Sequence, residues 1–122
     1  MILVDTSIWV DHLRTGDLRL VRLLERSEVL THSMVIGELA LGSISPREVL
    51  LDALSALPTS VEPTPAEVTH VIESRTLFGR GIGLVDAHLL ASALLTPDAR
   101  LWTRDRRLGA VARDLHLVVA DE

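Results

Sequence analysis

Four acidic residues occupy positions where a charged side chain is costly. Glu38 is the only charged residue between Ser33 and Gly42, in the middle of a predicted apolar helix. Asp86 begins another apolar helix, and Asp5 and Asp105 follow predicted strands. Burying an ionised carboxylate costs several kcal/mol or more unless it is paired or bound to a metal. These residues, called the four acids below, are therefore the candidate functional groups.

The four acids favour one kind of chemistry if they lie together. The carboxyl ends of parallel strands form the crevice in which open α/β sheets bind ligands, and Asp5 and Asp105 are expected there. An all-oxygen ligand set suits Mg²⁺ or Mn²⁺ rather than zinc. Such ions lower the pKa of a bound water and stabilise a leaving oxygen. The pattern predicts metal-assisted hydrolysis of a phosphodiester.

Each acid also has a simpler interpretation. Asp5, Asp86 and Asp105 are all near predicted helix starts, where Asp is a preferred N-cap worth about 1 kcal/mol. Glu38 lies too far inside its helix to be a cap, so its alternative is an ion pair with an arginine. The residue types leave these alternatives open.

Composition excludes several classes of protein. The 122 residues are 48% hydrophobic and 24% charged, which fits one globular domain over residues 1–122. The absence of cysteine excludes disulfides, thiolate zinc sites and cysteine nucleophiles. All 12 basic residues are arginine, so Walker-type phosphate binding and Schiff-base catalysis are excluded. The net charge of −5 argues against nucleic-acid coating through bulk positive charge.

Hydropathy predicts no membrane segment. The longest stretch without Asp, Glu, Lys or Arg, residues 87–97, is shorter than the ~18 apolar residues that a spanning helix needs. The amino end has neither the basic nor the apolar region of a secretory signal, so a cytoplasmic location is expected.

Hydrophobic periodicity predicts alternating strands and helices. The expected strands are 1–4, 29–31, 60–62, 100–103 and 115–119. The expected helices are 8–13, 18–26, 34–41, 47–57, 66–78, 85–95 and a short helix after Asp105. This order indicates an α/β fold with a mostly parallel sheet of about five strands and helices on both faces.

Four motifs in this order resemble the PIN-domain nucleases, and among them the VapC-type toxins of toxin–antitoxin pairs. The motifs span nearly the whole chain: Val4-Asp5-Thr6-Ser7-Ile8-Trp9, Ile36-Gly37-Glu38-Leu39, Val85-Asp86-Ala87-His88-Leu89 and Leu101-Trp102-Thr103-Arg104-Asp105. The resemblance implies a PIN-like fold in which Asp5, Glu38, Asp86 and Asp105 form the catalytic, metal-binding centre. It also implies that Thr6 or Ser7, and Thr103, support this centre.

The resemblance further implies a function and partners. The expected activity is that of an endoribonuclease dependent on Mg²⁺ or Mn²⁺, which cuts selected structured RNAs such as tRNA or ribosomal RNA and thereby inhibits translation. The expected partners are a second copy, forming a homodimer, and a VapB-type antitoxin, in a heterotetramer or larger assembly. The amphipathic helices 18–26 and 47–57 are candidate surfaces for an antitoxin helix.

Arginines near the motifs are candidate substrate contacts. Arg104, Arg106 and Arg107 flank Asp105, and guanidinium groups bind phosphate in bidentate fashion. Arg80 lies in the glycine-rich loop 79–83, which does not have the dinucleotide-binding pattern. The alternative is a solvated helix start for the first three arginines and flexible linking for the loop.

Rival functions have weaker support. Receiver-like and haloacid-dehalogenase-like domains also place an Asp after the first strand, but both usually need a lysine, which this chain lacks. The five histidines do not show the spacing of a zinc hydrolase. A non-catalytic PIN-like scaffold that binds RNA or protein is the alternative from another class, and it does not require all four acids.

Overall fold

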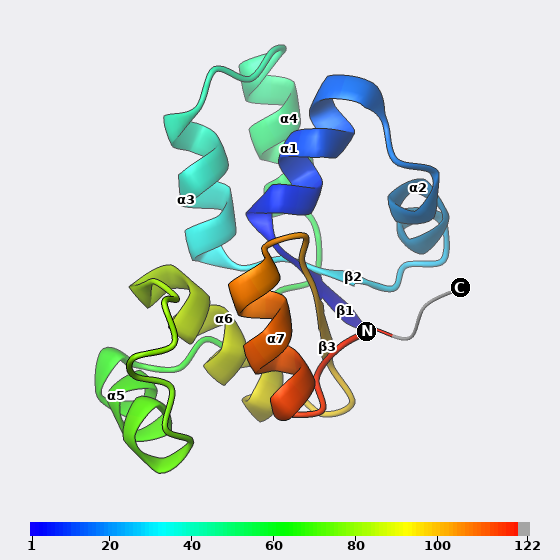
Figure 1. Ribbon diagram of the computed structural model, residues 1–122. Helices are drawn as coiled ribbons and strands as arrows, with labels where there is room; N and C mark the ends of the chain where they lie inside the picture. The colour runs from blue at the N-terminus through cyan, green and yellow to red at the C-terminus, as the bar shows by residue number, and fades with distance from the viewer. Residues whose placement is uncertain (120–122) are drawn as a thin grey trace.

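The computed structural model describes residues 1–119 (Figure 1). Its strands and helices, in chain order, are β1 (Ile2–Val4), α1 (Thr6–Thr15), α2 (Leu18–Glu25), β2 (Val29–Leu30), α3 (Ser33–Leu41), α4 (Arg47–Ser55), α5 (Pro65–Ser74), α6 (Leu84–Leu95), β3 (Arg100–Trp102) and α7 (Arg106–Asp114). Within residues 1–119, none of these helices has the length and apolar run that crossing a membrane requires.

The sheet is parallel, with the strand order β2-β1-β3. Helical crossovers connect the strands, as parallel pairing requires. In the register between β1 and β3, Val4 is paired with Trp102. Asp5 and Thr103, the next residues of the two strands, therefore emerge side by side at the carboxyl end of the sheet.

The prediction of about five strands is wrong, because the described part of the chain has three. The segment expected at 115–119 contributes only an isolated parallel bridge, Leu101 to Val118, and the bridge from Thr31 falls on Thr59, just before the segment expected at 60–62. The prolines at positions 58 and 63 bracket the first segment, and proline cannot donate to a strand ladder. Helix α7 ends at Asp114, and the turn after it, which places His116 at a φ of 58°, takes up the first two residues of the second segment.

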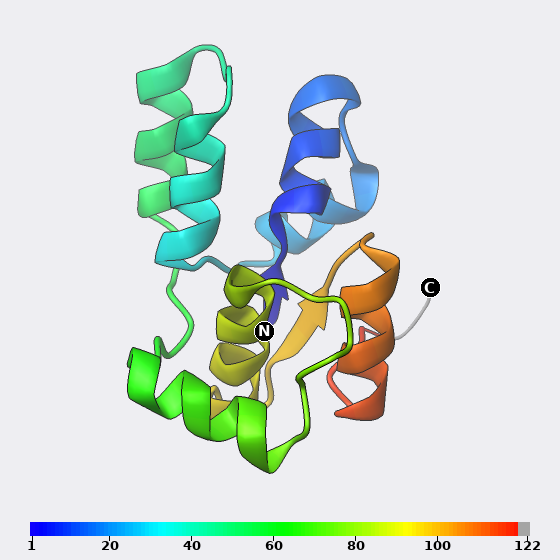
Figure 2. The same cartoon turned by 60° about the vertical axis from the view of Figure 1, so that its left-hand side comes forward.

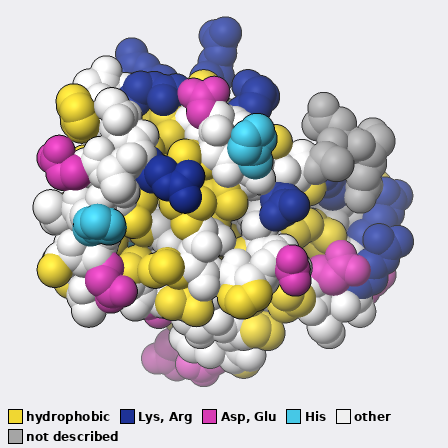
Figure 3. Space-filling view, turned by 90° about the horizontal axis from the view of Figure 1, so that it is seen from below, with side chains coloured by type: hydrophobic (Ala, Val, Ile, Leu, Met, Phe, Trp, Pro, Cys, Tyr) yellow, Lys and Arg dark blue, Asp and Glu magenta, His cyan; other side chains and the backbone are white. Residues whose placement is uncertain are grey.

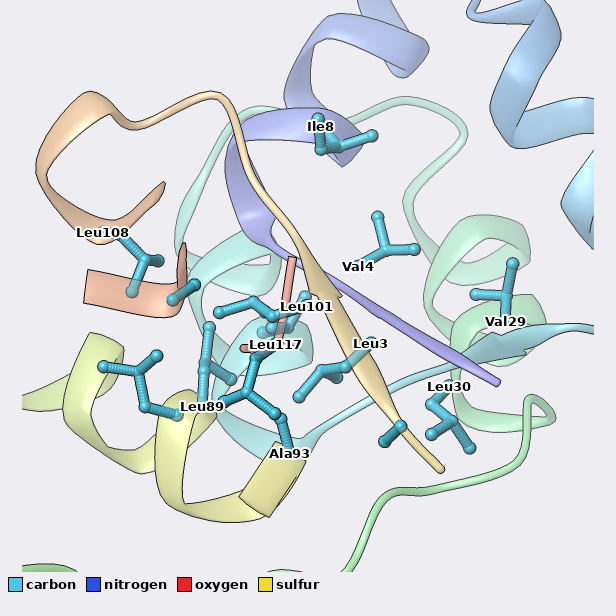
Figure 4. Close-up of a cluster of buried hydrophobic side chains, with 14 of the residues drawn as sticks. Leu3, Val4, Ile8, Val29, Leu30, Leu89, Ala93, Leu101, Leu108 and Leu117 are labelled. Atoms are coloured by element: carbon cyan, nitrogen blue, oxygen red, sulfur yellow. The ribbon is translucent and has the colours of Figure 1, made fainter. Parts of the chain in front are cut away.

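Buried side chains cover both faces of the sheet. Leu3 and Val4 point to opposite faces of β1, and both have 0% exposure. Figure 4 shows Leu3 and Leu101 beside Leu89 of α6, and Val4 directed the other way. The central strand is thus enclosed by packing on both sides, which explains its continuous apolar run.

The predicted helices are present, with shifted ends. The helix expected over 66–78 ends at Ser74, four residues early, because Thr76 adopts a φ of 54° and the Leu77 N–H returns to the Ile72 carbonyl. Gly79 is therefore part of the loop that follows this helix. The loop before α6 therefore begins at Arg75.

Several helices begin at the same end of the sheet. In Figure 2, β3 runs between α6 and α7, and both helices begin at the end where β3 finishes and α1 starts. Helix α3 packs against α1 and α4 above this end. The segments that carry the four acids therefore meet at the carboxyl end of the sheet.

Candidate active site

Asp5 is the buried centre of the site, with 6% exposure. Its Oδ2 accepts hydrogen bonds from Ser7 Oγ and Thr103 Oγ1, each at 2.7 Å, and from Ser7 N at 3.4 Å. Three donors on one oxygen stabilise the ionised carboxylate in a place from which water is largely excluded. Asp5 is also the N-cap of α1, as its simpler interpretation required.

Two hydroxyl relays attach the segment after β3 to Asp5. Arg104 N donates to Ser7 Oγ at 3.0 Å, and Asp105 N donates to Thr103 Oγ1 at 3.0 Å. Each hydroxyl accepts a backbone N–H and gives its own proton to Asp5. The contact of 3.4 Å between the two hydroxyl oxygens then needs no proton of its own. These hydrogen bonds fix the position of the Asp105 backbone relative to Asp5.

Glu38 is exposed, contrary to the expectation that its helix has no polar face. Helix α3 leaves one side open to solvent, since Gly37 is also exposed and Leu41 is 90% exposed. Thr6 Oγ1 donates to Glu38 Oε1 at 2.7 Å. Thr6, the residue after Asp5, thus ties the acid of α3 to the start of α1, and no arginine pairs with Glu38 among the contacts of residues 1–119.

Asp86 and Asp105 each cap a helix start. Asp86 is the third residue of α6, and its Oδ2 accepts from Gly83 N at 3.1 Å. Asp105 is the N-cap of α7, and its Oδ1 accepts from Leu108 N at 2.9 Å. The capping interpretation therefore describes real contacts at both acids.

The other three acids act on the electrostatics of Asp86. Burial raises the pKa of Asp86, and the carboxylates of Asp5, Asp105 and Glu38 raise it further, against the Gly83 N–H, which lowers it. Like charges have this effect only when they lie near each other. The carboxylates of Asp5, Glu38 and Asp105 are therefore near enough to Asp86 for their charges to act on it.

Each of the four acids keeps one carboxylate oxygen without a protein donor. In the part of the chain that the structure describes, hydrogen bonds reach Asp5 Oδ2, Glu38 Oε1, Asp86 Oδ2 and Asp105 Oδ1, and no donor reaches the second oxygen of any of them. Within residues 1–119, no three acidic or histidine side chains stand close enough to enclose a metal ion as they are positioned. One oxygen anchors each side chain, and the other is available to a ligand.

Two of the four candidate arginines already have carboxylate partners. The Arg104 guanidinium binds Asp11 at 2.7 Å and also binds Asp17, and it lies 5.9 Å from the Trp102 ring. Arg80 pairs with Asp114 at 2.8 Å. Arg104 joins the segment before α7 to α1 and to the start of α2, and Arg80 joins the loop before α6 to α7. Both guanidinium groups therefore point at acids of the protein.

The other two arginines lie at the start of α7. Arg106 is exposed, and no hydrogen bond or ion pair of its side chain occurs within residues 1–119. Arg107 lies across the loop before α6, where a Cβ added to Gly81 would be 2.9 Å from its Nη1. Their positive charge is therefore presented beside Asp105.

Sequence patterns did not identify His32 as a residue that positions the site. His32 is 1% exposed and is the N-cap of α3, because its Nδ1 accepts from Met34 N at 3.0 Å. Its Nε2 meets Ser92 Oγ of α6 at 2.9 Å. His32 thus joins the helix of Glu38 to the helix of Asp86. Histidine is an unusual N-cap, so residue type alone could not identify this role.

Comparison with known proteins places this arrangement in a family. The profile of the PIN domain matches residues 2–114. Ribonuclease VapC32 of Mycobacterium tuberculosis, strain CDC 1551 / Oshkosh, is 51% identical over 122 residues, which are 100% of this chain and 98% of that protein. The protein of the same name from strain ATCC 25618 / H37Rv gives the same identity and coverage.

Proposed function

This chain belongs to the PIN-domain family, among the VapC-type ribonucleases, and we propose that it cuts RNA with a divalent metal ion held by its four acids, Asp5, Glu38, Asp86 and Asp105. One observation carries this proposal: within residues 1–119, each acid has one oxygen anchored by the protein and one oxygen that no donor reaches.

The residues fit Mg²⁺ or Mn²⁺. The donor set consists of carboxylate oxygens, and the hydroxyls of Ser7 and Thr103 are already directed to Asp5. Four nearby negative charges repel one another unless a cation neutralises them. When bound, such an ion lowers the pKa of a water and stabilises charge on the phosphate.

The protein's own residues orient this chemistry. Ser7 and Thr103 hold Asp5, and the same two hydroxyls hold the backbone before Asp105. Thr6 holds Glu38, and the Gly83 N–H holds Asp86. We assign the supporting role to Thr6, Ser7 and Thr103 because each donates directly to one of the four acids.

We assign phosphate contacts to Arg106 and Arg107. Both are exposed at the start of α7, beside Asp105. Arg104 and Arg80 are engaged by carboxylates, so their proposed role is to hold the loops that carry them against neighbouring helices. On the face seen from below, acidic and basic side chains both occur among apolar ones (Figure 3), so this face of the protein is not uniformly basic.

We propose that a VapB-type antitoxin binds the groove between α1, α3 and α4. The groove encloses about 420 Å³ and reaches Glu38, and its apolar lining includes Val10, Leu13, Leu39 and Leu50. A smaller cavity of about 160 Å³ extends it toward Leu24 of α2 and Leu57. An amphipathic helix fits a groove of this kind. Leu50→Glu should abolish co-purification with the antitoxin while the circular dichroism spectrum stays unchanged.

We also propose that the protein is a homodimer that forms a heterotetramer or larger assembly with the antitoxin. Light scattering of the protein alone and of the complex tests both assemblies. A monomer at micromolar concentration contradicts the proposed homodimer.

The proposed activity is tested on total RNA with Mg²⁺, with Mn²⁺ and with EDTA, followed by sequencing of the new ends. We expect discrete cuts in tRNA or ribosomal RNA that require a metal ion and are lost in Asp5→Asn. The matched control is Asp52→Asn, which removes an exposed carboxylate of α4 that lies outside the site. If folded, antitoxin-free protein cuts no RNA class, the chain is a non-catalytic scaffold and the nuclease proposal is wrong.

A further inference from the structure

Phe78, the only phenylalanine of the chain, is 59% exposed. Leu84, the first residue of α6, is 66% exposed, and the glycine-rich loop 79–83 separates the two. A large ring and a leucine are thus exposed close together in the sequence. They flank the loop that leads to Asp86.

A cavity of about 230 Å³ lies between these residues. Its apolar lining is Ile72, Leu77, Phe78, Ile82, Leu84 and Ala87, and backbone of Gly79 and Gly83 completes it. Gly83 also donates its N–H to Asp86 Oδ2 at 3.1 Å. The cavity therefore shares a wall with the site of the four acids.

Arg107 adds positive charge beside this cavity. Its side chain lies so close to Gly81 that a Cβ there would be 2.9 Å from Nη1, and Gly81 has a φ of 76°. Only glycine accommodates both the backbone conformation and the guanidinium. An apolar, ring-lined cavity with an acidic metal-binding edge and a nearby guanidinium matches a nucleotide: a flat base and an anionic backbone.

We propose that this cavity is a nucleobase subsite in which Phe78 stacks on the base of an RNA nucleotide next to the bond that is cut. The proposal rests on the proposed function and names the element that selects the base there. Stacking is the usual way in which proteins hold unpaired bases of RNA, because every base has a π face. Phe78 is then a substrate-binding residue whose stacking strength sets a modest base preference, while the four acids do the chemistry.

The first experiment measures binding in an Asp5→Asn background, which prevents cutting. The probes are fluorescein-labelled octaribonucleotides of each single base, and an octamer of the same backbone without bases. We expect Phe78→Ala to weaken binding of at least one base-containing octamer by about 5- to 100-fold. Phe78→Trp should restore it, and the octamer without bases should bind both proteins equally. Val49→Ala, which trims a side chain with 65% exposure on α4, is the matched control and should have no effect.

The second experiment sequences the ends produced from total RNA by protein with an intact Asp5. Phe78→Ala should lower the rate and erase the base preference at one position flanking the cut, and Phe78→Trp should retain it. If Phe78→Ala weakens the octamer without bases as strongly, or changes the molecular mass seen by light scattering, the ring contacts backbone or a second copy, and the subsite is wrong.

The two experiments separate the two proposals. RNA that is cut with unchanged rate and base preference by Phe78→Ala overturns the subsite alone. Octamer binding that depends on Phe78, in a protein whose intact form cuts no RNA, supports the subsite and overturns the nuclease activity.

Discussion

Thr103→Val tests whether the hydroxyl relay holds the site together. The change keeps the shape of the side chain and removes the donor to Asp5 at 2.7 Å and the acceptor of the Asp105 N–H at 3.0 Å. A hydrogen bond to a charged group contributes about 1.5–3 kcal/mol and a neutral one about 0.5–1.5 kcal/mol. Thr103 is only partly buried, so hydrogen bonds to water recover part of the energy of both lost bonds. We expect the free energy of unfolding to fall by about 2 kcal/mol.

Urea unfolding followed by circular dichroism measures this loss. With a slope of about 2 kcal/mol per molar, the midpoint should fall by about 1 M. The control is Thr69→Val, because the Thr69 hydroxyl makes one exposed bond of 3.0 Å to the Pro65 carbonyl within α5. That variant should stay within about 0.5 kcal/mol of the parent protein.

Activity gives a second measure of the same change. Loss of a group that holds a metal ligand typically costs about 10- to 100-fold in metal affinity or rate. We expect the Mn²⁺ concentration for half-maximal cutting to rise in Thr103→Val and to stay unchanged in Thr69→Val. Equal midpoints and equal Mn²⁺ dependence in the two variants would refute the relay.

Three further predictions concern charge. Because the pKa of Asp86 is raised, its ionised form opposes folding, and Asp86→Asn in EDTA should have a higher Tm than the parent at pH 7.5. The difference in Tm should vanish near pH 3.5, where the aspartate of the parent is neutral like the asparagine of the variant. Arg104→Ala should lower the free energy of unfolding in urea by about 1 kcal/mol and leave the salt dependence of RNA binding unchanged. Arg107→Ala should lower the slope of log binding constant against log salt concentration by about 1. Burial lowers the pKa of His32, despite the opposing effect of Glu62, so the stability of the protein should fall as the pH drops below about 6.5. Thermal unfolding between pH 7.5 and 5 should show this loss in the parent and not in His32→Asn.

The sequence predicted the parts of the site that depend on strand ends. Asp5 and Thr103 follow apolar runs that had to be strands, and parallel pairing then had to bring them to the same edge. The hydroxyl residues Ser7 and Thr103 came from the family resemblance, and the structure gives each a direct contact with Asp5. Local pattern and topology together were sufficient here.

The sequence could not predict features that depend on how helices face one another. Glu38 looked buried because its neighbours are apolar, yet α3 turns that side toward solvent and toward Thr6. Arg104 looked like a phosphate contact, but Asp11 lies 93 positions away in the chain and binds its guanidinium. The link from His32 to Ser92 likewise spans 60 positions. Pairings of this kind are set by packing and leave no local pattern.

The choice between a helix cap and a metal ligand, which the sequence left open for Asp5, Asp86 and Asp105, has a physical resolution in the carboxylate itself. A cap needs one oxygen, and a carboxylate has two. At Asp105, Oδ1 accepts the Leu108 N–H, which fixes the direction of Oδ2 without occupying it. Capping therefore supplies the rigidity that a ligand requires, because a side chain already held at one oxygen loses little freedom when the other binds a cation. An aspartate at a helix start beside a strand end is thus suited to both roles, and neither can be assigned from its position alone.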